Sequence, residues 1–264
     1  MIKYSALLPL YYKESSPNLY QAISSILKQS YKPYELIIII DKIVNSSHLN
    51  IIRKFKNNSI KIFIYRGSKG LGDVLAYGVL KSKTEIIARF DSDDISDQYR
   101  IEKQIKFMNR SNVDAVGSSI IEFRHNKYDL NKRRFININN KNEFLRNPLN
   151  HMTVVFKKNA ILKSGNYKDL TNFEDWYLWL RVIKNGFKIS NVIEPLVYAR
   201  LGKNFYNKRH GFSYMLTELN AIRVFKSEFL IPSKFFYLNL LLRLPIRLLP
   251  IKILNIFYFY IRSK

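Results

Sequence analysis

Short apolar runs alternate with helical patterns through the first hundred residues of this chain. The apolar runs cover residues 3–10, 35–41, 60–65 and 86–90. Between the first two runs, residues 17–27 place their apolar side chains at the i, i+3, i+4, i+7 spacing of a helix with one buried face. Runs that are apolar throughout are typical of strands buried on both faces, as in parallel sheets covered by helices. The order β-α-β-α-β-α-β therefore predicts an α/β fold with a doubly wound, mainly parallel sheet.

The middle of the chain continues this pattern less regularly. We expect a charged helix over residues 97–108, a strand over 113–119, and a strand over 153–156 followed by a short helix that ends at Gly165. Residues 124–134 are polar and basic, which favours a loop or a flap. A further helix, with a stripe formed by both tryptophans, begins after Phe173 and ends at Gly186, a fitting C-terminal cap.

Composition excludes several classes of site. The 264 residues can bury a substantial core, and the absence of cysteine excludes disulfides, zinc–thiolate sites and thiol nucleophiles. The chain lacks the nucleophile elbow G-x-S-x-G, the phosphate-binding loop G-x-x-x-x-G-K-[ST] and the zinc motif H-E-x-x-H. Its net charge of +24 makes a polyanionic partner plausible: nucleic acid, an acidic membrane surface or phosphorylated substrates.

The C-terminal segment, residues 201–264, is both apolar and basic. From residue 200 onward there are twelve Lys or Arg residues against two Glu residues. Charges and prolines interrupt the apolar stretch, so that no uncharged window approaches the ~18 residues of a membrane span. We expect short amphipathic helices that lie on an anionic membrane surface. The alternative is a helical subdomain that packs on the core and keeps a solvated basic face.

Three carboxylates follow the last apolar run of the first hundred residues. Asp91, Asp93 and Asp94 lie at the carboxyl end of the strand predicted over residues 86–90, which is the edge where open α/β sheets bind ligands. Crowded carboxylates repel one another, and a fold that gathers them commonly offers them a hard cation. This spacing predicts a metal site; the alternative is a solvated turn whose last aspartates cap the next helix.

A second acidic pair, Glu174-Asp175, stands at the start of the tryptophan-containing helix. The helix dipole stabilises a carboxylate there, typically by about 0.3–1 kcal/mol. Taken alone, the pair could be helix-terminal acids and nothing more. Because Asp41 ends another apolar run, acids fall at several element ends of one predicted sheet, and this combination favours a functional site.

Seven motifs now resemble a known family when read in order. They are P-L-Y-Y-K-E, I-I-I-I-D, G-L-G-D-V-L-A-Y-G, A-R-F-D-S-D-D-I, R-I-E-K-Q, N-H-M-T-V-V-F and F-E-D-W-Y-L-W-L-R. In register from about Tyr4 to Arg200, they resemble the family 2 inverting glycosyltransferases with the GT-A (Rossmann-like) fold. The most similar subgroup builds bacterial capsule, exopolysaccharide and lipopolysaccharide. The resemblance implies a transferase domain over residues 1–200, with a nucleotide-binding half (1–95) and an acceptor half (96–200), followed by the C-terminal segment.

The resemblance implies roles for individual residues. For the nucleotide-sugar donor, the matching residues are Pro9, Tyr11, Glu14, Asp41, Gly70, Gly72, Asp91 and Ser92. Asp93 and Asp91 match the D-x-D pair that holds Mn²⁺ or Mg²⁺. Asp175 matches the general base, with Glu174 beside it. His151, Trp176 and Arg181 match positions near the acceptor.

The implied activity is transfer of one sugar, with inversion, from a nucleotide-diphosphate sugar to a hydroxyl of a glycan or lipid-linked oligosaccharide. We expect a UDP-linked donor, no nucleic-acid partner, and a cytoplasmic enzyme peripheral to the inner face of the cell membrane. Lys42-Ile43 and Tyr12 depart from the family pattern at the nucleotide loops. Two alternatives stay open: a D-x-D phosphotransferase or phosphohydrolase with Asp91 as nucleophile, and a basic RNA- or membrane-binding protein without catalysis.

Overall fold

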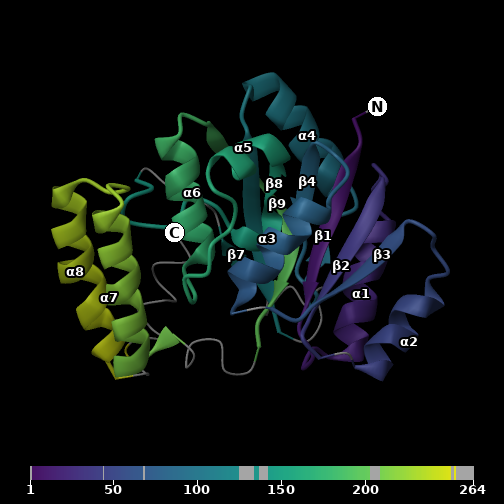
Figure 1. Cartoon of the computed structure of the whole chain (residues 1–264), viewed down its shortest axis with the longest axis horizontal. Helices are drawn as coiled ribbons and strands as arrows, with labels where there is room; N and C mark the ends of the chain where they lie inside the picture. Colours follow the sequence, from purple (N-terminus) through teal and green to yellow (C-terminus); the bar gives the residue numbers. More distant parts are fainter. Residues whose placement is uncertain are drawn as a thin grey trace.

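The amino-terminal half of the molecule is an alternation of strands and helices (Figure 1). The computed structural model describes residues 2–43, 45–67, 69–124, 134–136, 142–202, 209–250 and 253. The elements are β1 (Tyr4–Leu10), α1 (Ser16–Leu27), β2 (Glu35–Asp41), α2 (Ser46–Lys54), β3 (Ile60–Tyr65), α3 (Leu71–Lys81) and β4 (Ile86–Arg89). All seven were expected from the apolar runs and helical spacing.

These four strands are parallel and adjacent in the order β3-β2-β1-β4. Leu7 of β1 pairs with Ile37 of β2 on one side and with Arg89 of β4 on the other. Their carboxyl ends therefore meet at one edge of the sheet. The loops that follow β1, β2 and β4 carry most of the residues that the sequence assigns to the donor site.

The two faces of this sheet enter different cores. Leu8 and Ile38 pack with α1 and α4, whereas Leu7 and Ile39 pack with α3 and α6. Successive residues of a strand point to opposite faces. A strand covered by helices on both faces must therefore be apolar at every position, which explains the continuous run of isoleucines in β2.

The second half of the chain completes one mixed sheet. Its elements are β5 (Ile95–Ser96), α4 (Arg100–Ser111), β6 (Ala115–Phe123), β7 (Arg134–Ile136), the 3₁₀ turn η2 (His151–Thr153), β8 (Val155–Lys157), α5 (Lys158–Lys163), α6 (Glu174–Lys184) and β9 (Ile189–Arg200). The full order is β3-β2-β1-β4-β8-β6-β9-β5, with β7 paired to β6. β8 runs antiparallel to β4 and β6, and β9 runs parallel to β6.

The predicted α/β class is confirmed. The long strand β9 was not predicted, and most of the loop expected over residues 124–134 lies outside the described residues.

Two helices follow the sheet, α7 (Phe212–Ser227) and α8 (Ser233–Leu248). Figure 1 shows them beside each other on the side of the molecule next to α6. A third apolar cluster joins Trp176, Tyr177 and Leu180 of α6 to Ile222 and Phe225 of α7. The described part of the C-terminal segment is therefore helical and packs against α6. Within the described residues, no helix is long and apolar enough to cross a membrane.

Candidate active site

The acids after β4 converge as the sequence predicts. Carboxylate oxygens of Asp91, Asp93 and Asp94 lie within 4.8 Å of one another. Arg89, the last residue of β4, donates to Asp91 Oδ2 at 2.8 Å and approaches Asp91 Oδ1 at 2.5 Å. Burial, and then the charges of Asp91 and Glu14, raise the pKa of Asp93 to about 7.

Asp94 has a different structural role from its two neighbours. Its side chain is buried, and Oδ1 accepts the backbone N–H of Arg200 at 2.8 Å, so it ties the turn after β4 to the end of β9. No side chain caps the first turn of α4 among the described residues, and Asp97, just before the helix, accepts the Tyr99 N–H at 2.9 Å. The alternative in which the last aspartates of the cluster cap the next helix does not match these contacts.

Asp91 and Asp93 fit a divalent cation. They present hard carboxylate oxygens that one ion could bridge, and such ligands suit Mg²⁺ or Mn²⁺. Arg89 already balances one of the negative charges, so a bound cation would mainly offset the charge of Asp93. These two residues are the part of the chain that could hold the metal.

Asp175 lies in the first turn of α6 with both of its carboxylate oxygens held. Oδ1 accepts the backbone N–H of Trp176 at 2.7 Å, and Oδ2 accepts the side-chain amide of Asn147 at 2.5 Å. Burial raises the pKa of Asp175, and these two hydrogen bonds together with the charge of Arg89 lower it. The pKa of Asp175 is raised overall, so these contacts orient the carboxylate and offset only part of the cost of burying its charge.

Glu174, its neighbour, is buried without such help from side chains. Burial, followed by the nearby charge of Asp175, raises the pKa of Glu174 to about 7. Two adjacent acids thus occupy different environments. Such separation commonly marks different roles in a site.

The structure brings His151 close to Asp175, and it leaves Trp176 and Arg181, the other two residues expected near the acceptor, in other contacts. His151 Nδ1 lies 3.9 Å from Asp175 Oδ2, and Nε2 lies 3.1 Å from the hydroxyl of Tyr167. Burial, and then Arg89, hold the pKa of His151 well below its usual range, so the imidazole is neutral. The Trp176 side chain packs with α7, and Arg181 donates to the Ser164 carbonyl at 2.6 Å.

The residues expected to bind the nucleotide lie along the same sheet edge. Asp41, at the end of β2, has a buried Oδ1 with no hydrogen-bond partner among the described residues, which leaves an acceptor for a ligand N–H. Tyr11 is half exposed beyond β1. Glu14 is engaged locally, because its Oε1 accepts the Ser15 N–H. Pro9 is buried within β1, and Ser92 is buried between the two metal-site acids.

The glycine loop before α3 packs against the segment that leads to α6. A Cβ on Gly70 would lie 2.1 Å from Asp169 Oδ1, and a Cβ on Gly72 would lie 2.7 Å from the Lys168 carbonyl oxygen. Any side chain at Gly72 would meet backbone, which cannot move aside cheaply. The two glycines therefore allow the loop before α3 to contact the segment that leads to α6.

Three residues of the site were not identified from the sequence: Arg89, Asn147 and Tyr167. Arg89 carried a detectable signal, since a charge inside a strand buried on both faces needs a partner. Asn147 and Tyr167 carried none, because they lie 28 and 8 residues from Asp175 in irregular segments and meet it only in the folded chain.

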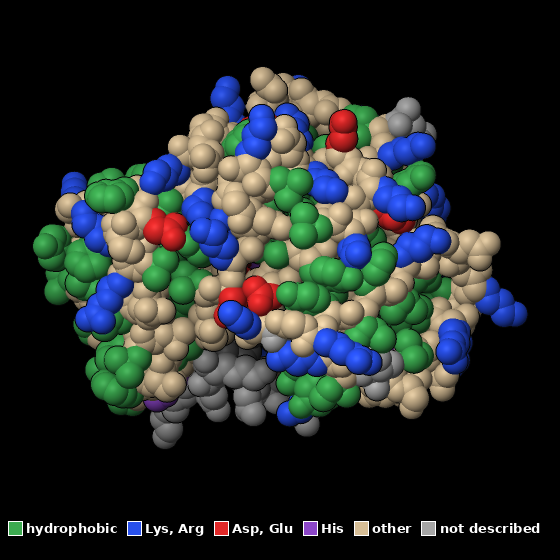
Figure 2. Space-filling view, in the orientation of Figure 1, with side chains coloured by type: hydrophobic (Ala, Val, Ile, Leu, Met, Phe, Trp, Pro, Cys, Tyr) green, Lys and Arg blue, Asp and Glu red, His purple; other side chains and the backbone are tan. Residues whose placement is uncertain are grey.

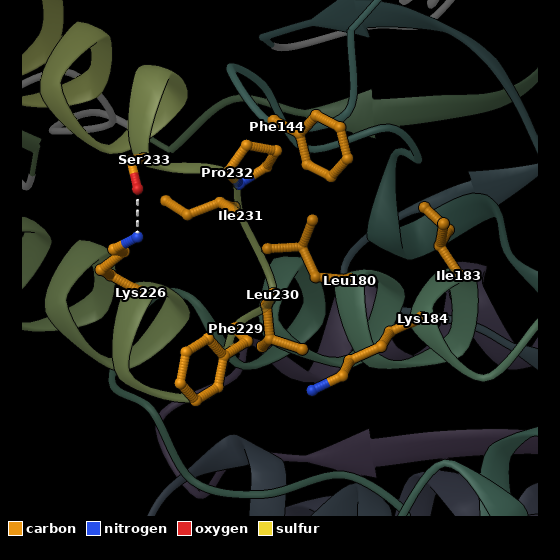
Figure 3. Close-up of a pocket in the computed structure, with 10 residues that line it drawn as sticks. All are labelled: Phe144, Leu180, Ile183, Lys184, Lys226, Phe229, Leu230, Ile231, Pro232 and Ser233. Atoms are coloured by element: carbon orange, nitrogen blue, oxygen red, sulfur yellow. Dashed lines mark hydrogen bonds between the residues drawn. The ribbon is translucent and has the colours of Figure 1, made fainter.

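A separate pocket of about 410 Å³ lies between α6 and the connection from α7 to α8 (Figure 3). Apolar side chains line it, including Leu180, Leu230 and Phe144, with Lys184 and Lys226 as its charged residues. No carboxylate lines this pocket, so it lacks the groups that the site after β4 provides.

Solved structures show which class of protein this fold defines. The chain superposes on S. aureus TarS residues 1–349 in complex with UDP-GlcNAc with a TM-score of 0.64, at 16% identity, over 84% of this chain and 66% of that one. It matches a mannosyltransferase from Pyrobaculum calidifontis in complex with GDP-Man and Mn²⁺ with a TM-score of 0.66, at 12% identity, over 98% and 75%. In the longer TarS structure it spans only 40% of the chain. The fold is that of the GT-A glycosyltransferases.

Sequence comparison identifies the family. Residues 5–170 match the model for Glycosyl transferase family 2. The amylovoran biosynthesis glycosyltransferase AmsE of Erwinia amylovora is 31% identical over 97% of both chains. The UDP-Gal:alpha-D-GlcNAc-diphosphoundecaprenol beta-1,3-galactosyltransferase of Escherichia coli is 33% identical over 94% of this chain and 92% of its own. The chain belongs to glycosyl transferase family 2 and is a glycosyltransferase.

Proposed function

We propose that this enzyme transfers one sugar from a nucleotide-diphosphate sugar to a hydroxyl of a glycan, with inversion at the anomeric carbon. The observation that supports this most is the division of the acids into two groups. Asp91 and Asp93 lie at the end of β4, and Asp175 lies at the start of α6, with Arg89 contributing to the electrostatics of both. One group suits a metal-bound diphosphate, and the other suits an acceptor hydroxyl.

Asp175 acts as the general base in this proposal. Its carboxylate accepts the proton of the acceptor hydroxyl while the acceptor oxygen forms a bond to the anomeric carbon. The bond from that carbon to the phosphate oxygen breaks, and the nucleoside diphosphate leaves with the electron pair. One base and no second nucleophile imply a single displacement.

Mg²⁺ or Mn²⁺ held by Asp91 and Asp93 would supply charge neutralisation for the leaving diphosphate. Ser92, buried between them, fits a position beside the donor. Both oxygens of Asp91 already bind Arg89, which disfavours the alternative in which Asp91 attacks a phosphoryl group. A phosphotransferase therefore finds less support than a glycosyltransferase.

The donor nucleotide binds along the loops after β1 and β2 in this proposal. The unpartnered Asp41 oxygen could accept an N–H of a base such as uracil, and Tyr11 lies exposed nearby, beyond the end of β1. We infer a UDP-linked donor from this acceptor and from the UDP-Gal named for the Escherichia coli relative. Gly70 and Gly72 belong to the loop that would lie beside the nucleotide.

The acceptor that fits the relatives is a lipid-linked sugar. Two relatives from Escherichia coli are named for alpha-D-GlcNAc-diphosphoundecaprenol, and AmsE is named for amylovoran biosynthesis. We infer that this chain extends a lipid-linked oligosaccharide in bacterial cell-surface polysaccharide biosynthesis. A charge of +24 suits the diphosphate of such an acceptor and an anionic membrane around it.

The outer face of α8 supports membrane contact at the cytoplasmic surface. Tyr237 is 67% exposed and Leu241 70% exposed, while Asn239 and Arg247 on the opposite face are buried. Arg243 and Arg247 both bind the buried Glu218 of α7. The helix thus turns Arg243 and Arg247 inward, while Tyr237 and Leu241 form an exposed apolar patch, which is unusual on a helix face in contact with water.

Phe229, in the turn before α8, adds to this surface. Phe229 is 80% exposed and has a φ of +55°. This left-handed conformation is usually adopted by glycine and costs a bulky residue about 1–2 kcal/mol. Figure 2 shows hydrophobic side chains, with Lys and Arg among them, along the edge of the molecule that α7 and α8 form. Such a surface suits the boundary between headgroups and acyl chains.

Asp175→Asn tests the proposed mechanism. The amide keeps the shape of the side chain but cannot accept the proton, so transfer should fall by at least about 10²-fold while the donor dissociation constant stays within about twofold. Radiolabelled transfer to a lipid-linked acceptor and calorimetry with the donor measure the two. Turnover equal to that of the wild type would refute the assignment of the base.

A further inference from the structure

Asn147 is the one side chain among the described residues that donates a hydrogen bond to the Asp175 carboxylate. Its Nδ2 lies 2.5 Å from Asp175 Oδ2, while the backbone N–H of Trp176 holds Oδ1. With a donor at each oxygen, the carboxylate cannot rotate about χ2 without losing a hydrogen bond. A bond between a neutral donor and a charged acceptor is stronger than one between neutral groups.

The segment that carries Asn147 is itself held from several sides. The Leu149 N–H donates to Asn147 Oδ1 at 3.3 Å, so the amide is oriented with its nitrogen toward Asp175. The carbonyl of Phe144 accepts from Asn239 of α8 at 2.8 Å, and that of Leu145 accepts from Arg243 of α8 at 2.9 Å. Helix α8 thus fixes the backbone just before Asn147.

From this geometry we propose that Asn147 is the positioning residue of the base: its amide fixes the rotation of the Asp175 carboxylate so that a free lone pair faces the acceptor hydroxyl. The inference rests on the proposed role of Asp175. It adds a residue from outside the E-D motif to the site, and it connects the C-terminal helices to the chemistry through residues 142–149.

The groups around Asp175 determine how the loss of Asn147 would be measured. Glu174 precedes it on α6, Arg89 approaches from β4, His151 approaches from η2, and Tyr167 approaches from the segment after α5. His151 is neutral, and Arg89 remains in every variant described below. Glu174, which also titrates, is kept as well, so a change at position 147 appears as a shift of the acidic limb of the rate profile relative to the wild type.

Asn147→Asp tests whether the hydrogen bond that Asn147 donates matters, because it removes the donor and keeps the shape of the side chain. The variant keeps the size of the side chain and the acceptor for the Leu149 N–H, but it replaces the amide donor with a second carboxylate at 2.5 Å from Asp175. A like charge disfavours the anion. The acidic limb of kcat should move up by at least about one pH unit, with kcat at neutral pH reduced about 10-fold or more and the donor KM within about twofold.

Asn147→Ala removes the hydrogen-bond donor without adding charge. It should also move the acidic limb of the kcat profile to higher pH, but by less than Asn147→Asp does. It decides the question if Asn147→Asp does not fold, as judged by circular dichroism. If the folded Asn147→Ala variant kept the kcat and the pH profile of the wild type, the proposal would be wrong.

Asn191→Ala is the matched control. Asn191 donates to the carbonyl of Pro148 at 2.9 Å, so its loss loosens the same segment without removing a contact to the base. We expect lower stability and an unchanged pH profile. If this variant shifted the limb as far as Asn147→Ala does, general loosening would explain the effect and Asn147 would have no specific role.

The outcome for Asp175→Asn keeps this inference distinct from the proposed function. If Asp175→Asn is inactive and Asn147→Asp keeps the rate and pH profile of the wild type, only the positioning role of Asn147 is refuted. An active Asp175→Asn enzyme refutes both.

Discussion

Arg89 binds Asp91 through two contacts, at 2.8 Å to Oδ2 and 2.5 Å to Oδ1, at the carboxyl end of a central strand. The arginine is only 3% exposed, whereas Asp91 is partly exposed at the site. The charge of Arg89 also acts on Asp175, His151 and Asp93. The charge of Arg89 therefore acts on both groups of acids, and the buried Arg100 adds to it at Asp91 and Asp94.

Replacing Arg89 should cost both stability and activity. Arg89→Met removes the arginine that pairs with Asp91 beside Asp93 and Asp94, and breaking a buried ion pair from one side typically costs about 3 kcal/mol or more. Urea denaturation measures the loss. Arg89→Lys, which keeps the charge but not the two-point contact, should recover part of the stability and little of the activity. Wild-type stability in Arg89→Met would contradict the role we assign to this pair.

Removing Asp93 should abolish the dependence of donor binding on metal. With Asp93→Ala, we expect UDP to bind equally weakly with Mn²⁺ and with a chelator, because the ion loses one of its two protein ligands. Isothermal calorimetry compares the two conditions. Asp114→Asn is the control, since Asp114 pairs with Lys157 in a contact apart from the acid cluster and should leave the metal dependence intact. If wild-type UDP binding proved as tight with the ion chelated, the metal site itself would be wrong.

Glu174 should make the stability of the enzyme fall as pH rises. The unfolded chain releases this proton near the ordinary pKa of 4.5, while the folded chain holds it to about 7. Between these values the native state binds more protons than the unfolded state, so the free energy of unfolding decreases with pH.

The Glu174→Gln side chain is neutral at every pH and should remove this decrease in the free energy of unfolding. The variant should be more stable than the wild type at pH 8, by up to about 3 kcal/mol, and nearly equal to it at pH 4.5. Thermal unfolding in EDTA at the two pH values measures the difference. A variant that gained as much at pH 4.5 as at pH 8 would show that packing, and not titration, is responsible.

The outward face of α8 should bind anionic vesicles. Tyr237→Glu with Leu241→Glu places two negative charges on the exposed apolar face and should reduce co-sedimentation with phosphatidylglycerol vesicles by about 10-fold or more. Ile193→Glu, at a 68% exposed position on β9, is the matched control and should bind as the wild type does. Equal losses in the two variants would mean that net charge alone governs binding, and the α8 surface would then have no part in it.

Periodicity in the sequence predicted the layers of this fold and the edge at which its acids lie. The run E-L-I-I-I-I-D could be assigned to a buried parallel strand because a strand covered on both faces has no polar position to offer. The acids Asp41 and Asp91–Asp94 follow such runs directly, so local sequence sufficed to place them at one edge. β9 escaped prediction because Glu194 and Pro195 interrupt its pattern, and its pairing with β6 and β5 is set by neighbours distant in the chain.

What the sequence alone determined was therefore the set of elements and the chemical identity of the acids at their ends. The tertiary structure decided which side chains meet those acids. Asn147 reaches Asp175 across 28 residues, and Glu218 binds Arg243 and Arg247 on the inner side of α8, while Tyr237 and Leu241 lie exposed on its outer side. The physical reason is that strand and helix periods depend on residues a few positions apart. Hydrogen bonds and ion pairs between segments depend instead on the packing of the whole chain, which no local pattern encodes.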